Sequence, residues 1–417
     1  MKSKVFQRSH CRICNSTNLT KVLSFEKMPL TEDFVSQGDI GSEFLADNNV
    51  YFCQDCHTVQ TQHDVDFTEY YKEFYQYSVG QSPTASRFME AISSELVDKY
   101  FQGAHDLKVL EVGSGDGGQL IPFKRIGCQV LGYEPSSKSV EVAQNQGIPT
   151  IQGLFDKNSI NNLPEEFKTV DIILLSYTFD HLPEPVEFLR TARSILNPQR
   201  GVLVVEVHNL ERIFERREFC LFEHEHSIYL TRATAQSLLE QEGFTAINFD
   251  IVPETIRRAN SLIFVATPST SELQSLRVPP VDLPEYSQLG FYQEQAKEIN
   301  QGIENLDNFV SQVIQRGETI AGYGAGGRGV ATLAAMNQSH QMSYLIDKNP
   351  HGENLYTPKS NLPIFGLEKL QESPVDHLLV FSFGYMNEIK QDLKRFGYQP
   401  QQAHSMIDIT QNKDYQK

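Results

Sequence analysis

Short apolar runs alternate with helical patterns of hydrophobic residues along the chain from residue 107 onward. Runs with the length and composition of buried strands occur at residues 108–112, 129–133, 171–176, 202–207 and 261–266, and helical patterns lie between the early runs. Strands that alternate with helices form a parallel sheet covered by helices on both faces. We therefore predict an α/β domain over residues 107–268.

Helical patterns flank this domain on both sides. A helix within a connector over residues 67–106 is indicated by Phe88, Ile92, Leu96 and Tyr100. After the Pro- and Ser-rich residues 268–290, an amphipathic helix is indicated by Ile299, Ile303, Leu306, Val310 and Val313. We assign this helix to a linker over residues 269–316. Strand-like runs at 318–323, 342–346 and 378–381 then predict a second, C-terminal Rossmann-like domain over residues 317–417.

Four cysteines precede the first alternation and form two tight pairs. Cys11 and Cys14 make one CxxC knuckle, and Cys53 and Cys56 make a second one 38 residues later. Two such knuckles place four thiolates around one tetrahedral Zn²⁺, and a closed shell of four leaves no position for water. Redox pairs are the alternative, but neither knuckle opens a helix in a βαβ pattern. We predict a small domain with a structural zinc ion over residues 1–66.

Charge and composition exclude several classes of function. The net charge of −17 disfavours nucleic acid as a partner. It also means that an anionic acceptor needs a local basic pocket. No apolar run approaches the roughly 18–20 residues that span a membrane, and the first twelve residues lack the apolar core of a signal peptide. We expect a cytoplasmic protein in which the six cysteines do not form a disulfide framework.

The first strand of the large domain runs into a glycine-rich turn. Its sequence is Glu111-Val-Gly113-Ser-Gly115-Asp-Gly117-Gly118. Glycines let the backbone approach a ligand closely, and the N-terminus of the next helix points free N–H groups at the same place. The spacing fits the GxGxxG pattern of dinucleotide-binding proteins and also the ExGxGxG pattern of class I methyltransferases. Glu134 ends the second strand, 19 residues after Gly115, where it can bind both ribose hydroxyls.

Two further segments favour the methyltransferase interpretation. Residues 171–185 and 196–206 resemble the fourth strand, its helix and the turn into the fifth strand of class I methyltransferases. The resemblance covers residues 107–266 and implies S-adenosylmethionine as the cofactor, with NAD or a fold without cofactor as the alternative. The expected cofactor-binding residues are Glu111, Gly113, Gly115, Gly117, Glu134, Phe155, Asp156 and His181. Of these, Phe155 and Asp156 are expected at the adenine, although Phe155 is equally well explained as a core residue.

Nearly the whole chain resembles the sugar C-methyltransferase family, whose members act on nucleotide-linked 4-keto-deoxysugars. The resemblance rests on five motifs in the family's order: Met28-Pro29-Leu30 with Phe34, Phe74-Tyr75-Gln76-Tyr77-Ser78, His224-Glu225-His226 with Tyr229, Gly322-Tyr323-Gly324-Ala325 with Gly329, and Asp347 with Pro350-His351. It implies a zinc domain, a methyltransferase domain and a C-terminal Rossmann-like domain. The chain departs from the family's motifs at Thr31-Glu32, Glu223 and Gly326-Gly327-Arg328, and lacks the second Ser after Tyr77. These changes lie where the acceptor should bind, so they bear on which acceptor is used.

Carbon methylation next to a ketone requires a base that makes an enolate, and histidine titrates near the required pH. The resemblance supports His226 as this base, with Glu225 orienting it or sharing the task and Tyr77 stabilising the oxyanion. His226 as a scaffold residue, and His224 with His226 as metal ligands, are the alternatives. We group His224 with the catalytic candidates. His181 is expected to frame the cofactor pocket.

The C-terminal glycine-rich turn would indicate NAD binding if it stood alone. By resemblance to the family, the domain instead closes over the nucleotide sugar, with Arg328 offering charge to its phosphates. The implied substrate-binding residues are Tyr75, Tyr323, Gly324, Arg328 and Asp347. A methyltransferase for another acceptor (at oxygen, nitrogen or a non-sugar carbon) and an inactive binding protein remain as alternative functions.

Overall fold

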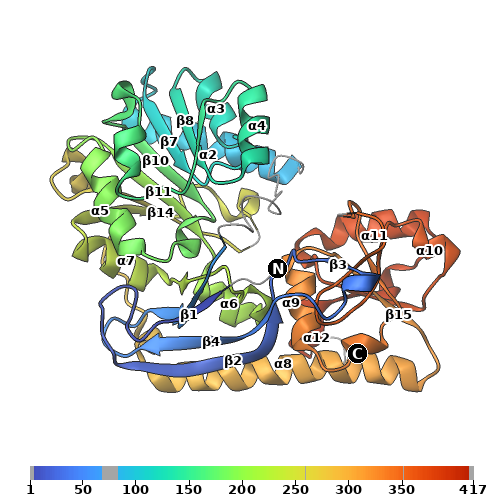
Figure 1. The fold of residues 1–417 in the computed structure, drawn as a ribbon. Coiled ribbons are helices and arrows are strands. Elements are labelled where there is room, and N and C mark those ends of the chain that lie inside the picture. Colours follow the sequence, from blue (N-terminus) through green and yellow to red (C-terminus); the bar gives the residue numbers. More distant parts are fainter. Residues whose placement is uncertain (1–3, 68–82, 259, 351, 413–417) are drawn as a thin grey trace.

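The computed structural model describes residues 4–67, 83–258, 260–350 and 352–412. The chain forms three units joined by a long helix (Figure 1). The central unit (residues 83–268, cyan and green), predicted from the sequence to be the methyltransferase domain and called the methyltransferase unit below, lies above the N-terminal unit (residues 4–67, blue). The C-terminal unit (residues 317–412, orange and red) lies beside both. Tyr75 and Tyr77, which the sequence places in the acceptor site, fall outside the described residues.

The methyltransferase unit is built on a seven-stranded sheet with the order β13-β14-β11-β10-β7-β8-β9. Its strands are β7 (Lys108–Val112), β8 (Gln129–Glu134), β9 (Thr150–Gln152), β10 (Ile172–Ser176), β11 (Val202–Val207), β13 (Phe244–Phe249) and β14 (Leu262–Pro268). Five neighbouring strands run parallel to one another, as predicted: β11, β10, β7, β8 and β9. The prediction of a wholly parallel sheet is wrong at the other edge. There β14 runs antiparallel to β11 and to β13, because the described residues between β13 and β14 form only the short 3₁₀ helix Glu254–Ile256 and no crossover helix.

Helices cover both faces of this sheet (Figure 1). They are α2 (Pro83–Phe101), α3 (Leu120–Arg125), α4 (Ser137–Asn145), α5 (Pro185–Ile195) and α7 (Arg232–Gln241). Helix α6 (Leu210–Arg216) packs instead into the core shared with the N-terminal unit. Ile172 and Leu174 of β10 belong to the core on the α2 side, whereas Ile173 and Leu175 belong to the core on the α5 side. The strand is apolar at every position because both faces are buried.

The N-terminal unit is hydrogen-bonded to both other units. Its main sheet has the order β12-β5-β4-β2, with β2 (Leu19–Pro29), β4 (Leu45–Cys53) and β5 (Val59–Thr61). The fourth strand, β12 (Ile228–Tyr229), begins two residues after His226 and comes from the methyltransferase unit. Two small pairs complete the unit: β1 (Val5–Gln7) with β6 (His63–Val65), and β3 (Val35–Ser36) with β17 (Leu355–Tyr356) of the C-terminal unit. The His224–His226 segment is therefore fixed between two units.

The C-terminal unit contains a parallel sheet with the order β18-β16-β15-β19-β20. Its strands are β15 (Ile320–Tyr323), β16 (Leu345–Ile346), β18 (Ile364–Phe365), β19 (His377–Val380) and β20 (Ala403–Ser405). Its helices are α9 (Gly327–Ala335), α10 (Lys369–Glu372), α11 (Met386–Arg395) and α12 (Met406–Thr410). This strand order is that of a Rossmann-like unit.

Helix α8 (Leu289–Gln315) runs beneath the N-terminal unit to the C-terminal unit (Figure 1). It begins earlier than the predicted amphipathic pattern, and the buried face includes Ile299, Leu306, Val310 and Val313 as predicted. These residues share one hydrophobic core with β2 and the C-terminal sheet. None of the helices in the described parts of the chain is long and apolar enough to cross a membrane.

Candidate active site

The glycine-rich turn after β7 is shaped by three glycines with positive φ. Gly113, Gly115 and Gly117 have φ of 72°, 51° and 79°. A Cβ on Gly113 would lie 2.3 Å from Oγ1 of Thr178, and one on Gly117 would lie 3.1 Å from Ile148. A Cβ on Gly115 would meet nothing within 4 Å. Gly113 and Gly117 are thus required by packing, whereas Gly115 faces open space beside the cavity described below.

Two buried carboxylates frame this turn, and both were predicted from the sequence. Glu134 ends β8 and accepts hydrogen bonds from the backbone N–H of Gly115 at 2.9 Å and of Ser136 at 2.8 Å. Glu111 has one carboxylate oxygen, Oε2, that is buried without a hydrogen-bond partner among the described residues. Burial raises the pKa of both side chains. A buried carboxylate without a partner beside a glycine turn fits a ligand that brings positive charge or hydrogen-bond donors.

A cavity of about 500 Å³ opens at the carboxyl ends of β7, β8 and β10. Among the residues that the structure describes, the lining contains a single arginine, Arg258. It also contains nine acidic residues: Asp64, Asp66, Glu111, Asp116, Glu134, Asp156, Glu184, Glu187 and Glu225. Such a lining attracts a cationic ligand and repels a pyrophosphate. S-adenosylmethionine carries a sulfonium and an ammonium group, so the residues present fit this cofactor and not NAD.

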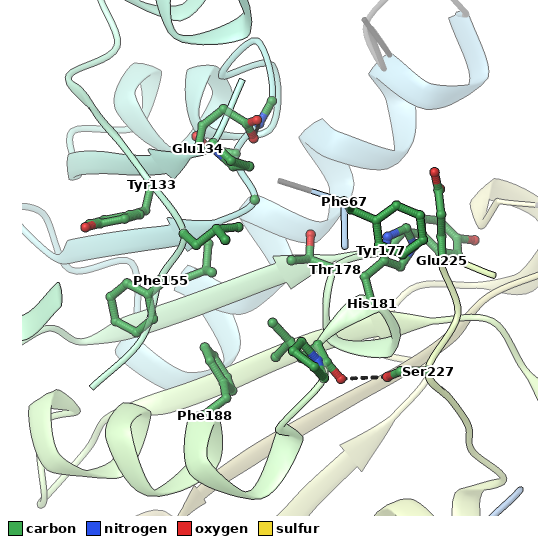
Figure 2. A pocket seen from close by; sticks show the side chains of 18 of the residues that line it. Phe67, Tyr133, Glu134, Phe155, Tyr177, Thr178, His181, Phe188, Glu225 and Ser227 are labelled. Carbon is green, nitrogen blue, oxygen red and sulfur yellow. Dashed lines mark hydrogen bonds between the residues drawn. The ribbon is translucent and has the colours of Figure 1, made fainter. Parts of the chain in front are cut away.

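The two ends of the cavity differ in character (Figure 2). One end is aromatic: the ring of Phe155 lies 5.2 Å from that of Tyr133 and 6.0 Å from that of Phe188. The other end carries the polar side chains of Tyr177, His181 and Glu225. A flat purine fits the first end, which places the reacting end of the cofactor at the second.

Of the three remaining residues predicted to bind the cofactor, Asp156 and His181 line the cavity and Gly117 does not. Asp156 lies at the exposed rim, and its carboxylate accepts hydrogen bonds from the backbone N–H groups of Asn158 and Ser159. Gly117 is not part of the cavity lining. His181, on the short helix Phe179–His181 after β10, does line the cavity.

His226 lies behind the residues that line the cavity. It is 4% exposed, and its Nδ1 donates a hydrogen bond to the carbonyl of Leu221 at 2.7 Å. Its ring packs between those of His181 and His208, with centroid distances of 5.0 and 4.5 Å. Burial lowers the pKa of His226 to about 3. The ring is therefore neutral at pH 7 with a free lone pair on Nε2, and burial makes it a weaker base than the near-neutral histidine expected from the sequence. Glu225, the next residue back in the chain, does line the cavity.

Two residues beside His226, namely Asp180 and His208, were not predicted from the sequence. His208 follows the last residue of β11, and its Nδ1 donates a hydrogen bond to Asp180 at 2.9 Å. The backbone N–H of His208 donates to the same carboxylate oxygen at 3.2 Å. A histidine at the carboxyl end of a parallel strand, where ligands collect, was the sequence feature that could have indicated His208.

His224 points away from His226 and joins two units. Its Nε2 donates to the carbonyl of Met28 at 3.0 Å, so its Nδ1 accepts the hydrogen bond from Nε2 of His63, at 2.8 Å. Burial lowers the pKa of both His63 and His224 to about 4. Since His224 and His226 have separate partners, they do not form a common metal-ligand pair. His224 holds the segment against the N-terminal unit.

The two cysteine knuckles converge as predicted. The Sγ atoms of Cys11 and Cys56 are 3.5 Å apart, those of Cys14 and Cys53 are 3.6 Å apart, and all four lie within 4.8 Å of one another. Zn–S bonds of about 2.3 Å in a tetrahedron require sulfur atoms roughly 3.8 Å apart. Gln60 donates a hydrogen bond to Sγ of Cys11 at 3.0 Å, which helps to orient this ligand. The four thiols fit a structural zinc ion.

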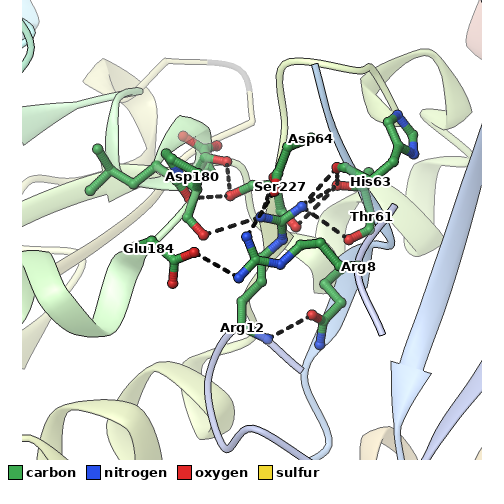
Figure 3. Close-up of polar contacts among 11 residues, drawn as sticks. Arg8, Arg12, Thr61, His63, Asp64, Asp180, Glu184 and Ser227 are labelled. Carbon is green, nitrogen blue, oxygen red and sulfur yellow. Dashed lines mark hydrogen bonds and ion pairs between the residues drawn. The ribbon is translucent and has the colours of Figure 1, made fainter. Parts of the chain in front are cut away.

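The first knuckle also anchors one wall of the cavity (Figure 3). Arg12, between the two cysteines of this knuckle, has a fully buried guanidinium. It donates to a carboxylate oxygen of Asp64 at 2.5 Å, to the carbonyl of His63 at 2.8 Å and to that of Pro183 at 3.1 Å. All three acceptors line the cavity, so zinc binding and the shape of the cavity are structurally connected.

We expect purified protein to contain about one zinc ion per chain and Cys53→Ser to lose it. Because metal binding is part of the folding free energy of such sites, the variant should have a lower melting temperature. Cys128→Ser is the control, since Cys128 is buried in the methyltransferase unit away from the knuckles. Elemental analysis of protein prepared without chelator provides the measurement, and metal-free wild type would contradict the assignment.

The C-terminal turn repeats the geometry of the cofactor turn. Asp347 follows β16, and its Oδ2 accepts from the backbone N–H of Ala325 at 2.7 Å, as Glu134 accepts from Gly115. Gly324 has a φ of 107°. Tyr323, predicted to bind substrate, is 5% exposed and packs in the core of the C-terminal sheet.

Arg328 lies where the C-terminal unit meets the methyltransferase unit. Its Nη2 is 3.6 Å from Oε2 of Glu218, and its guanidinium lies 5.1 Å from the ring centre of Phe383. Two departures from the family motifs meet nearby. A Cβ on Gly327 would lie 3.3 Å from Oε1 of Glu223 and 3.4 Å from Oγ1 of Thr31, and burial raises the pKa of Glu223 to about 8. Positions far apart in the sequence thus form one local surface.

A second cavity, of about 920 Å³, lies between these two units and is lined by residues of both. The C-terminal unit contributes Phe383, Gly384, Ile407 and Gln411 to its lining. The methyltransferase unit contributes five arginines, which are Arg212, Arg216, Arg232, Arg257 and Arg258, and four acidic residues. Arg258 lines both cavities. The two cavities therefore meet at this side chain.

Comparison with known proteins gives a consistent assignment along the chain. Three family models match, described as "Putative zinc binding domain" over residues 11–71, "Methyltransferase domain" over residues 85–275 and "C-methyltransferase C-terminal domain" over residues 283–403. The C-methyltransferase NovU of Streptomyces niveus is 25% identical over 392 residues, which are 93% of this chain and 92% of NovU. A ubiquinone biosynthesis O-methyltransferase of Rhizobium etli (strain CIAT 652) is 26% identical over 135 residues, 31% of this chain and 52% of that enzyme, so the chain spans about half of its length.

Solved structures resemble part of the chain. Magnesium protoporphyrin IX methyltransferase (ChlM) from Synechocystis PCC 6803 is 18% identical, with a TM-score of 0.35, and the match covers 45% of this chain and 84% of that one. The CcbJ methyltransferase from Streptomyces caelestis is 16% identical, with a TM-score of 0.35, covering 49% of this chain and 96% of that one.

The sheet, the glycine turn with its two carboxylates and the methyltransferase model define a class I S-adenosylmethionine-dependent methyltransferase. The three models in this order, and the match to NovU along nearly the whole chain, narrow the class. Along nearly its whole length the chain is similar to C-methyltransferases that carry an N-terminal zinc-binding unit and a C-terminal unit of their own.

Proposed function

We propose that this enzyme methylates a carbon next to the ketone of a nucleotide-linked keto-deoxysugar. The observation that carries the proposal is the pair of cavities that meet at Arg258. The first is lined by nine acidic residues and one arginine, which suits a cationic cofactor. The second is lined by five arginines and four acidic residues, so it is the more basic of the two and the one suited to the phosphates of an acceptor. The similarity to NovU supports carbon as the methylated atom.

The cofactor would be held by the residues that frame the first cavity. Glu134 would bind the ribose hydroxyls, Phe155 would pack against the purine, and Glu111 with the Gly113–Gly115 turn would face the amino-acid part. When bound, S-adenosylmethionine supplies an electrophilic methyl group on its sulfonium. The chain contributes by orienting this group toward Tyr177, His181 and Glu225 at the polar end.

The acceptor would occupy the second cavity and extend toward Arg258. The arginines of α6 would bind its phosphates, helped by Arg328, whose guanidinium lies over the ring of Phe383. Phe383 of the C-terminal unit lines this cavity. Gly324 and Asp347 shape the turn that positions Arg328. Tyr75 and Tyr77 retain their proposed roles in binding the sugar and stabilising the oxyanion.

His226 is the proposed base. Its Nδ1 is occupied by the carbonyl of Leu221, so Nε2 accepts the proton that leaves the carbon next to the ketone. Glu225 is the second candidate, because it lines the cofactor cavity and His226 does not. Variants of the two residues distinguish these roles.

The test is a panel of acceptors offered with methyl-labelled S-adenosylmethionine, followed by the intact mass and fragmentation of the products. We expect label on carbon only when the acceptor is a nucleoside-diphosphate-linked keto-deoxysugar. The matched control is the same keto sugar without its nucleotide, which lacks the phosphates for the arginines. Label on oxygen or nitrogen, or equal transfer to the free sugar, would contradict the proposal. We place this reaction in the cytoplasm.

A further inference from the structure

Asp180, His208 and His226 form a cluster behind the polar end of the cofactor cavity, where Tyr177 packs on His208 and His181 packs on His226. One nitrogen of each imidazole and one carboxylate oxygen of Asp180 lie within 4.8 Å of one another. The cluster extends from the interior toward solvent: His226 is 4% exposed, and the side chain of His208 is 15% exposed. His208 belongs to none of the roles assigned above.

The polar side-chain atoms of this cluster that make no hydrogen bond to the described residues are all acceptors. The Nδ1 atoms of His226 and His208 both donate, to the carbonyl of Leu221 and to Oδ2 of Asp180 respectively. In the neutral rings both Nε2 atoms are therefore acceptors. Oδ1 of Asp180 is also an acceptor, and it is buried without a hydrogen-bond partner among the described residues. An added proton supplies the donor that this arrangement lacks.

Asp180 is suited to stabilise a protonated His208. Burial alone would raise the pKa of Asp180, but the hydrogen bond and charge of His208 hold it well below its usual range. The carboxylate is also fixed, because the backbone N–H of His208 donates to it at 3.2 Å. The ring of His208 is held in turn by that of Tyr177, 4.6 Å away, whose hydroxyl donates to the carbonyl of Asn260.

We propose that His208, held by Asp180, takes the proton from His226 and releases it to solvent. The inference rests on the proposed function, in which His226 is the base. The C–H bond next to the ketone breaks, its electron pair forms the enolate that bonds to the methyl carbon, and the proton goes to Nε2 of His226. The carbon–sulfur bond electrons neutralise the sulfonium, so each methyl transfer leaves one proton on the enzyme. This proton passes to Nε2 of His208, directly or through one water molecule, and then to solvent.

The geometry explains why such an exit is needed. The rings that pack on His226 belong to His181, His208 and Tyr229. His181 lines the cofactor cavity, and the hydroxyl of Tyr229 is itself buried. His208 combines a carboxylate partner with contact to solvent. His208 is thus a positioning and proton-exit residue and need not touch the acceptor.

The experiment follows the proton separately from methyl transfer. A nucleoside-diphosphate-linked 4-keto-6-deoxyhexose, deuterated next to the ketone, is incubated with enzyme and S-adenosylhomocysteine in ordinary water. The loss of deuterium is followed by mass spectrometry. Wild type should exchange, and His226→Asn should not. His208→Gln keeps a donor for Asp180 but cannot carry a proton. It should therefore slow the exchange and the steady-state turnover by roughly 10- to 100-fold, the scale of a lost proton-transfer group.

Three further readouts separate proton exit from a structural role. In His208→Gln, the affinity for S-adenosylhomocysteine and the rate of methyl transfer in the first turnover should stay within about threefold of wild type, since His226 can still accept one proton. Added imidazole should restore exchange in His208→Ala. Asp180→Asn, which keeps a hydrogen-bond acceptor without the charge, should also slow exchange. His340→Gln is the control, because His340 is exposed on the C-terminal unit.

Failure of the inference and failure of the proposed function give different results. If wild type does not exchange the acceptor, or His226→Asn exchanges as fast as wild type, the proposed function is wrong and the inference falls with it. If wild type exchanges, His226→Asn does not, and His208→Gln matches wild type, only the proton-exit role is overturned. An equal loss of first-turnover rate and exchange in His208→Gln would also overturn it.

Discussion

His226→Asn should lower turnover on a nucleotide-linked keto-deoxysugar by on the order of 100-fold or more, the scale of general-base loss. The amide of asparagine can still donate to the carbonyl of Leu221, which receives the hydrogen bond of Nδ1 in wild type. The variant therefore keeps the local hydrogen bond and loses only the lone pair at Nε2. Affinity for S-adenosylhomocysteine should barely change, because His226 is not part of the cofactor cavity lining.

Steady-state kinetics with the acceptor, and calorimetry with S-adenosylhomocysteine, measure the two expectations. Glu225→Gln is the companion variant, and it should cost less if Glu225 only orients groups around the base. A larger loss in Glu225→Gln, with near-normal turnover in His226→Asn, would transfer the role of base to Glu225 and leave His226 as scaffold. The melting temperature of each variant separates a loss of chemistry from a loss of folded protein.

The sequence predicted the features that depend on short spacings. Two residues between cysteines, or one between glycines, already limit where the chain can go, so the zinc knuckles and the turn after β7 could be placed before the structure was known. Glu111 and Glu134 followed from the position of this turn between two strands. The alternation of strands and helices likewise predicted both Rossmann-like units.

Contacts between segments far apart in the chain were not predictable in this way. The strand β12 is only two residues long, and its partner β5 lies about 170 positions earlier. Asp180 and His208 meet because β10 and β11 are neighbours in the sheet and both end at the same edge. An arginine between two zinc ligands is expected at the surface from the sequence. The guanidinium of Arg12 is instead buried, where it donates hydrogen bonds to Asp64 and to the carbonyl of Pro183. Tertiary packing decides these positions, and local patterns carry little information about it.

These long-range contacts give the N-terminal unit a role beyond holding zinc. His63, Asp64 and Phe67 line the cofactor cavity, and the hydrogen bond between His63 and His224 fixes the segment that carries Glu225 and His226. The zinc knuckle positions Arg12, which in turn binds Asp64 and the carbonyl of His63. The four cysteines are distant in the sequence from Glu225 and His226, but the zinc site supports a wall of the cofactor cavity.

Gly115→Arg should abolish detectable binding of S-adenosylmethionine and S-adenosylhomocysteine, a loss of affinity on the order of 100-fold or more. A side chain at this position meets no protein atom within 4 Å of its Cβ, so it extends into the space beside Glu134, where the ligand would lie. The guanidinium also places positive charge among the carboxylates that should attract the cationic cofactor. Calorimetric titration measures the effect.

Gly317→Arg is the matched control for Gly115→Arg. Gly317 also has a positive φ, of 77° against 51° for Gly115, and a Cβ there would likewise meet nothing within 4 Å. Both variants should pay a similar backbone strain of about 1 kcal/mol, and their melting temperatures should fall by similar amounts. Because Gly317 lies in the turn between α8 and the C-terminal sheet, its variant should bind the cofactor like wild type. Retained binding in Gly115→Arg, or NAD binding to the wild-type cavity, would show that the turn after β7 does not hold S-adenosylmethionine.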